Sequence, residues 1–553
     1  MQSRSRSSFL LCGVLLCATA LRATADEPPA DAVYLGGRIF TADPKKPWVE
    51  AFAVNGARIS AVGSRAQIEP MAGPKTRRVE LKGQTVIPGL NDAHHHFVAS
   101  TPDAIAIPPP ASSDWNALQA SIAAAVEKAP AGALLQGEIS FQAWFDKKAT
   151  RETLDPFTGS HPVVLITVEG HGALLNTAAL NRFHFGKNPP RLEGGWFEKN
   201  ADGHSTNGRL LEAAVFLLYQ RQQGAIPRTL KLSDLRAMAA EEIRLGWTSI
   251  QTMARIPVGT MSALAAEAGP PLRIRVIRFP VNIDDVGEIT GGEHFPHLAP
   301  NVTVSGLKWF LDGGPAEKTA AIRGSYNDGT TPRRLYSPQQ VRFMLRQGLD
   351  QHEQLLFHVG GEAGIEELFT AMESTASVDW PSLRVRIEHG DELREDLFAR
   401  ARHLGVVLVE NPFHFGLEPG NSAEEQNARD FPQGPAYILR SVVEAGIPLA
   451  LGTDGPNNPG LNILFASTNP AHPAEAMTRE QAVVAFTRGA AFAEFKEKEK
   501  GTLAPGMLAD FVVLSKDIFT ASAAELAEIH SELTVIDGQV AFDAARTRQP
   551  RVR

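Results

Sequence analysis

The segment Val86-Ile-Pro-Gly-Leu-Asn-Asp-Ala-His-His-His-Phe97 decides how the rest of this chain is interpreted. A short apolar run leads into Pro88-Gly89, and three consecutive histidines follow a few residues later. Successive side chains of a strand point to opposite faces, so His94 and His96 are expected on one face and His95 on the other. Two imidazoles on one face can bind the same metal ion. The segment therefore predicts a metal site near the end of a strand.

Between residues 86 and 499, apolar runs of strand length alternate with longer stretches of helical periodicity. The apolar runs are Val163–Val168, Thr248–Met253, Leu272–Ile277, Val304–Phe310, Leu355–His358, Arg384–His389, Val406–Glu410 and Leu449–Asp454. This alternation is typical of parallel βα units, and about eight of them favour a closed α/β barrel of the TIM type. An open, doubly wound sheet is the alternative. Residues 102–243 are expected to form an insertion of helices and loops over the site.

The two ends of the chain have a different pattern of residues from the segment between them. Residues 26–85 and 500–553 contain short β-type runs that are separated by glycines and charged turns. We expect these two segments to combine into one small β-sandwich domain beside the barrel.

Residues 1–25 have the features of a secretory signal peptide. Arg4 and Arg6 precede an apolar run from Phe9 to Ala20, and Ala23-Thr24-Ala25 ends in the small-x-small pattern of a cleavage site. The mature protein is therefore expected to be exported, to the periplasm or the medium. No later segment has the roughly 20 apolar residues of a membrane span, so no membrane contact is expected after cleavage.

Composition limits the chemistry and the partners. Both cysteines, Cys12 and Cys17, lie in the signal segment, so a metal in the mature protein must be held by nitrogen and oxygen. The formal net charge of −8 and the lack of a basic cluster argue against nucleic acid and favour a small-molecule substrate. The sequence leaves a homo-oligomer open.

Four later runs end in, or contain, polar residues that can bind metal. His358 and His389 close two runs in the same register, Asp454 closes a third, and Lys308 lies inside a fourth. In an α/β barrel the carboxyl ends of the strands face the catalytic mouth. Each residue alone has an ordinary structural explanation, but their recurrence in this order favours a shared site.

Taken in order, these motifs resemble the amidohydrolase superfamily. The matching stretches are Pro88–His96, Gly306–Gly314, Phe357–Gly360, Ile387–Gly390, Leu451–Asp454 and the tail Lys500–Leu514. The long insertion, the stretch Gly170–Asn176 and the Lys308 motif resemble the branch that contains N-substituted formamide deformylases.

The resemblance implies a distorted (β/α)8 barrel with a metal site at its mouth. His94 and His96 would bind the more buried ion, and His358 and His389 the more exposed one. Lys308, carboxylated by carbon dioxide, would bridge two ions, although some members keep one. Asp454 would contact the metal and the attacking water. His171 and His414 are expected to contact the substrate.

The predicted function is hydrolysis of a C–N bond in an amide, an N-acyl or N-formyl compound, by metal-activated water. Zinc is the first choice for a site of nitrogen and oxygen ligands, with iron and manganese as alternatives. Deamination or ring opening of a heterocycle, and hydrolysis of an ester or lactone, are alternatives that need the same metal chemistry. A non-catalytic exported binding protein on the same scaffold is a remote alternative.

Overall fold

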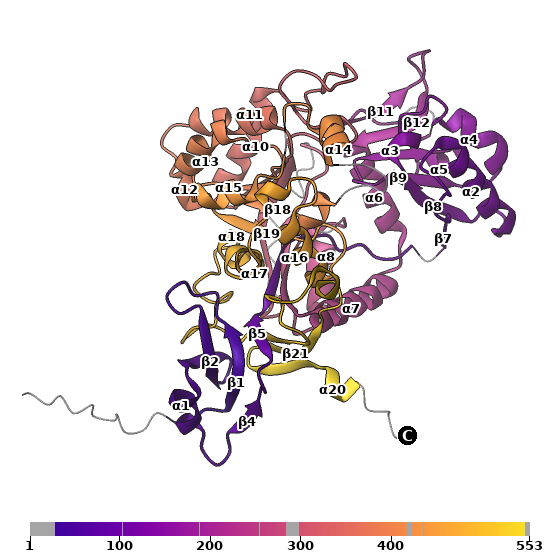
Figure 1. Cartoon of the computed structure of the whole chain (residues 1–553). Helices are drawn as coiled ribbons and strands as arrows, with labels where there is room; N and C mark the ends of the chain where they lie inside the picture. Colours follow the sequence, from indigo (N-terminus) through magenta and orange to yellow (C-terminus); the bar gives the residue numbers. More distant parts are fainter. Residues whose placement is uncertain are drawn as a thin grey trace, which may run out of the picture.

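Eight parallel strands form a barrel at the centre of the computed structural model (Figure 1). The model describes residues 28–101, 103–186, 189–253, 255–283, 298–416, 423–434 and 436–547, and the predicted signal peptide lies outside them. In barrel order the strands are β6 (Leu90–His95), β13 (Trp247–Thr252), β14 (Arg273–Arg278), β15 (Val302–Phe310), β16 (Leu355–Val359), β17 (Arg386–His389), β18 (Val407–Glu410) and β19 (Leu449–Leu451). The predicted α/β barrel is confirmed.

The first and last strands of this order close the barrel through polar contacts. The backbone N–H of Asp454 donates to the carbonyl oxygen of His94 at 3.0 Å. Asp92 accepts two hydrogen bonds from Thr453, from the backbone N–H at 2.9 Å and from Oγ1 at 2.6 Å. The seam between β6 and β19 therefore fixes His94 and Asp454 against each other.

Helices connect the barrel strands. The longer ones are α7 (Arg228–Leu245), α8 (Val258–Ala268), α10 (Pro338–Gln351), α11 (Glu362–Glu373), α13 (Phe398–Leu404), α15 (Leu439–Glu444), α16 (Pro459–Thr468) and α17 (Arg479–Val484). After α17, the helix α18 (Ala490–Ala493) contacts the barrel interior, because the carbonyl of Ala490 accepts from Gln251 and that of Ala493 accepts from Gln354. No helix in the described part of the chain is both long and apolar enough to cross a membrane.

The insertion is an α/β unit with its own six-stranded sheet, placed to one side of the barrel in Figure 1. Its strands are β7 (Ala104–Ala106), β8 (Leu134–Ile139), β9 (Val163–Thr167), β10 (Gly172–Leu175), β11 (Gly195–Lys199) and β12 (Thr206–Glu212). Its main helices are α2 (Trp115–Lys128), α4 (Arg151–Thr158), α5 (Thr177–Arg182) and α6 (Ala213–Ala225). The unit contains helices and loops, and also a sheet that the sequence analysis did not predict.

The run Val163–Val168 was predicted as a barrel strand, and this prediction was wrong. The run forms β9 of the inserted sheet. A short buried apolar run has the same pattern in any parallel sheet, and β9 does pair in parallel with β8. The pattern predicts a strand correctly but cannot say to which sheet it belongs. The other seven predicted runs correspond to β13 to β19, and the eighth barrel strand is β6, which carries His94.

Strands from both ends of the chain share a third sheet, at the bottom of Figure 1. They are β1 (Ala32–Phe40), β2 (Trp48–Asn55), β3 (Arg58–Gly63), β4 (Arg77–Glu80), β5 (Thr85–Pro88), β20 (Phe511–Leu514), β21 (Ser531–Ile536) and β22 (Gln539–Asp543). Strand β5 pairs with β1 and with β20, so it joins the two ends. Gly89 alone separates β5 from barrel strand β6, and a Cβ there would lie 2.2 Å from Oγ1 of Thr248.

Substitution of Gly452 tests how closely β6 and β19 approach each other at the seam of the barrel. A Cβ at this position would lie 2.4 Å from both the backbone nitrogen and the Cβ of His94. We expect Gly452→Ala to lower the free energy of unfolding by about 1–3 kcal/mol, because neither strand can move away without loss of the seam contacts. The measurement is urea denaturation followed by circular dichroism.

Gly224→Ala is the matched control. Gly224 lies in helix α6, and no heavy atom would come within 4 Å of its added Cβ. Alanine should be neutral or stabilising there, by about 0.5–1 kcal/mol. A Gly452→Ala protein as stable as wild type would contradict the described seam.

Candidate metal centre

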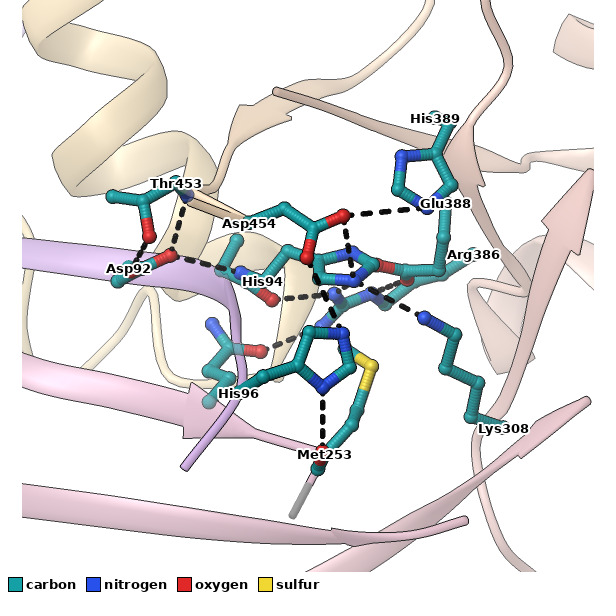
Figure 2. Close-up of polar contacts among 12 residues, drawn as sticks. Asp92, His94, His96, Met253, Lys308, Arg386, Glu388, His389, Thr453 and Asp454 are labelled. Atoms are coloured by element: carbon teal, nitrogen blue, oxygen red, sulfur yellow. Dashed lines mark hydrogen bonds and ion pairs between the residues drawn. The ribbon is translucent and has the colours of Figure 1, made fainter. Parts of the chain in front are cut away.

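The predicted metal-binding side chains meet at the carboxyl ends of the barrel strands, and Figure 2 labels all of them except His358. His94 lies on β6 and His96 follows it, while Lys308, His358 and His389 lie on β15, β16 and β17. Asp454 follows β19, and its carboxylate points toward His94, His96 and His389. These residues are separated by up to 360 positions in the sequence, and parallel strand order alone brings them together.

His94 is fully buried and held from behind by a carboxylate. Its Nδ1 donates to Oε2 of Glu388 at 2.6 Å, so the Nε2 lone pair faces the centre of the site. Nε2 lies 3.1 Å from Nζ of Lys308 and 3.7 Å from Oδ2 of Asp454. A carboxylate behind an imidazole is the usual arrangement of a histidine metal ligand.

His96 has the same arrangement with a backbone acceptor. Its Nδ1 donates to the carbonyl oxygen of Met253 at 2.6 Å, and its Nε2 lies 3.3 Å from Oδ1 of Asp454. His95 points elsewhere, because its Nε2 lies 3.7 Å from Oε1 of Glu242 on helix α7. Alternation along the strand thus separates His95 from the other two imidazoles.

Asp454 is the residue that the histidines surround. Besides His94 and His96, Nε2 of His389 and Nε2 of His414 each lie 3.8 Å from its Oδ2. Burial alone would raise the pKa of Asp454, but the neighbouring imidazoles and Lys308 lower it below the usual value. Asp454 also has a positive φ of 43°, a backbone conformation that is uncommon for residues other than glycine.

His358 and His389 are buried without enough hydrogen-bond partners. Neither ring nitrogen of His358 nor Nδ1 of His389 makes a hydrogen bond of normal length and angle within the described part of the chain, although each residue is only 5% exposed. Buried polar atoms in native proteins are almost always paired, so these nitrogens indicate a missing ligand. The ring of His358 lies 4.5 Å from that of His389 and 4.4 Å from that of Phe310, between centroids.

The protonation of the site suits a cation. Burial lowers the pKa of four imidazoles below the usual histidine value, which leaves them neutral and able to donate a lone pair to a metal. They are His94, His96, His358 and His389. Burial also lowers the pKa of Lys308 to about 8, so its amine is more readily deprotonated than that of an exposed lysine.

One group of side chains is already close enough to bind a single ion. The ligand atoms of His94, His389 and Asp454 all lie within 4.8 Å of one another. This group takes one histidine from each of the two pairs that the sequence predicts. The residues present therefore fit a divalent metal at the barrel mouth.

His171 and His414 lie at the edge of this centre. His171 is on the β9–β10 turn of the insertion, and its ring centroid is 4.7 Å from that of His358. Nδ1 of His171 bonds to Oε2 of Glu212 at 2.7 Å; burial alone would lower the pKa of His171, but Glu212 raises it to about 9. His414 stacks on His389 with ring centroids 5.4 Å apart, and its side chain is 29% exposed.

Three buried carboxylates support the site and were not predicted to do so. Glu388 holds His94, Asp92 holds the seam, and Asp312 accepts the backbone N–H groups of Gly360 and Gly361, each at 2.9 Å. Asp312 thus supplies the hydrogen bonds for the loop behind His358. All three lie within the motifs of the resemblance, where Glu388 is adjacent to His389, Asp92 is two residues before His94 and Asp312 is four residues after Lys308. This proximity in the sequence is the signal that could have identified them.

Comparison with known proteins agrees with this geometry. A model of the amidohydrolase family matches residues 77–542. The N-substituted formamide deformylase of Arthrobacter pascens is 25% identical, over 93% of this chain and 98% of that protein. The protein LONG AFTER FAR-RED 3 of Arabidopsis thaliana is 26% identical, over 88% of this chain and 87% of that protein.

Among solved structures, an uncharacterized metal-dependent hydrolase from Pyrococcus horikoshii has a similar fold. The TM-score is 0.65 at 17% identity, and the match covers 89% of this chain and 99% of that one. The family model covers the barrel, the insertion and strands β4, β5, β20, β21 and all but the last residue of β22, whereas β1, β2 and β3 precede the matched residues. This chain therefore belongs to the amidohydrolase family.

Proposed function

We propose that this protein hydrolyses the C–N bond of an N-acyl or N-formyl amide at the metal centre described above. The observation that carries the proposal is the position of Asp454, whose carboxylate lies 3.3–3.8 Å from nitrogens of His94, His96 and His389. A single carboxylate at that position can serve both the ion and a reacting water. The similarity to a formamide deformylase supports the choice of bond.

The ligands would divide as the resemblance to the superfamily implies. His94 and His96 would hold the more buried ion and His358 and His389 the more exposed one, and a carboxylated Lys308 would add an anionic ligand. The group of His94, His389 and Asp454 is the place where a single ion would bind if the protein keeps one. Zinc is the metal that we propose, because all these ligands offer nitrogen or oxygen.

When bound, the metal would polarise the scissile carbonyl and lower the pKa of water. The residues of the chain then have to move one proton. Asp454 takes it from the attacking water, whose oxygen joins the carbonyl carbon, and returns it to the leaving nitrogen as the C–N bond breaks. The products are a carboxylic acid and an amine. The lowered pKa of Asp454 keeps its carboxylate ionised at neutral pH.

The surroundings of the centre would bind the substrate. We propose that His414, partly exposed beside Asp454, and His171, at the tip of the insertion, contact the substrate. We also propose that the protein works outside the cytoplasm, in the periplasm or the medium, after removal of residues 1–25.

Asp454→Asn tests the proton transfer. Asparagine has the same shape and tolerates the positive φ of this position, so folding and metal content should stay close to wild type. Turnover should fall about a hundredfold or more, because the amide cannot accept a proton. The measurement is kcat on the amide that a panel of N-formyl, N-acyl, imide and ester compounds identifies as the best substrate.

Asp202→Asn is the control for this variant, because Asp202 lies in an exposed loop of the insertion. It should retain full activity. Asp454→Asn with a tenth or more of the wild-type turnover would show that Asp454 is not the proton carrier.

Glu388→Gln tests the carboxylate behind His94. Glutamine keeps the shape but not the charge, so metal affinity should weaken by about 10- to 100-fold. The measurement is zinc titration of the chelator-treated protein, with zinc content by mass spectrometry. The control is Glu241→Gln, since Glu241 is exposed on helix α7 and its side chain bonds to Arg244. Unchanged zinc affinity in Glu388→Gln would remove His94 from the ligand set.

A further inference from the structure

Asn411 is a buried side chain that the mechanism above does not use. It follows β18, is 0% exposed, and neither its Nδ2 nor its Oδ1 has a hydrogen-bond partner among the described residues. An unpaired buried polar group costs roughly 1–3 kcal/mol, and this residue carries two. Because buried polar atoms in native proteins are almost always paired, the unpaired Nδ2 and Oδ1 indicate that a ligand forms hydrogen bonds with them.

The direction of Asn411 follows from the strand before it. Val407 and Val409 pack with Ala450 of the neighbouring strand β19, with Ala93 of β6 and with Ala490 of α18, which identifies the inward face of β18. The backbone of Asn411 is still extended, with φ −124° and ψ 97°, so the alternation of side chains continues to it. Asn411 therefore lies above Val409 on the inward face, at the mouth of the barrel.

The strands on either side place Asn411 beside the metal centre. Val409 pairs with Glu388 of β17, so Asn411 lies just beyond the level of His389. On the other side Glu410 pairs with Leu451 of β19, which puts Asn411 level with Gly452, just before Asp454. The open amide thus lies between the strand ends that carry His389 and Asp454.

Its enclosure limits what can reach it. Asn411 is as inaccessible as His94 and Lys308, which are also 0% exposed, so only a group that enters between the strand ends can contact it. In a substrate of the proposed reaction, that group is the one being cleaved. The distant parts of the substrate stay near the partly exposed His414.

The chemistry of the side chain indicates what this group must offer. An asparagine amide has N–H donors and a carbonyl acceptor, and here both are open. The N–H of an amide substrate can donate to Oδ1, and a carbonyl oxygen that enters the site can accept from Nδ2. An ester has no donor, and it would leave Oδ1 of Asn411 unpaired in a buried site.

We propose that Asn411 is the specificity residue that selects amides bearing an N–H over esters and N-alkylated amides. This inference rests on the proposed function, because it names the substrate class of the same site. A site built to bond a substrate N–H discriminates against an analogue without it, because the group on the protein is left unpaired. The ester and lactone alternatives would then be poor substrates for reasons of binding.

The test compares matched substrates on wild type and Asn411→Leu, both loaded with zinc. Leucine has a similar volume and no hydrogen bond. The substrates are the best N-acyl or N-formyl amine from the panel, the ester in which oxygen replaces the N–H, and the N-methyl amide. The quantity measured is kcat/KM for the amide divided by kcat/KM for the ester, so differences in intrinsic reactivity cancel between the two proteins.

We expect this ratio to fall at least roughly tenfold in Asn411→Leu. A general loss of folded protein would lower both values equally and leave the ratio unchanged. An unchanged ratio overturns the inference while the proposed function stands, whereas hydrolysis of no amide by wild type overturns the proposed function and this inference with it.

A second measurement uses wild type alone, so it does not depend on how the variant folds. The N-methyl amide should be hydrolysed at least roughly tenfold more slowly than the N–H amide, judged by kcat/KM. Equal values for the two amides overturn the inference.

Discussion

The buried contact between Glu388 and His94 is the interaction on which the site depends. Glu388 also bonds to Arg386, at 2.6 Å and 2.9 Å, and all three side chains are 0% exposed. Burial alone would raise the pKa of Glu388, but Arg386 and His94 lower it to about 2. Arg386 in turn holds Gln251 and the carbonyl of Ala93. One carboxylate on β17 therefore fixes an imidazole on β6, and Arg386 connects the same carboxylate to β6 and β13.

The other parts of the structure are each connected to the strand or side chains of this contact. The seam between β6 and β19 sets Asp454 against His94, and the β9–β10 turn of the insertion brings His171 against His358. The chain-end sheet meets the barrel at Gly89, one residue before β6. The barrel and the insertion thus both contribute to the cluster of histidines, whereas the chain-end sheet joins β6 at the opposite end from His94.

Much of this could be predicted from the sequence, because the signal is local. A polar residue at the end of an apolar run identified His358, His389 and Asp454 as neighbours, and the barrel follows from strand and helix alternation. The supporting contacts could not be predicted in the same way. Glu388 bonds to a residue 294 positions away, and Val163–Val168 has the same pattern in an inserted sheet as in a barrel. Such features depend on which strands become neighbours.

The most direct test of the account is the position of the metal itself. Crystals of the zinc-loaded protein, with data collected on both sides of the zinc absorption edge, would locate each ion by its anomalous signal. The account predicts a peak within bonding distance of His94 and Asp454, with zinc to imidazole nitrogen distances of about 2.0–2.1 Å. A fully loaded crystal with no peak between the strand ends, or with zinc bound only elsewhere, would contradict it.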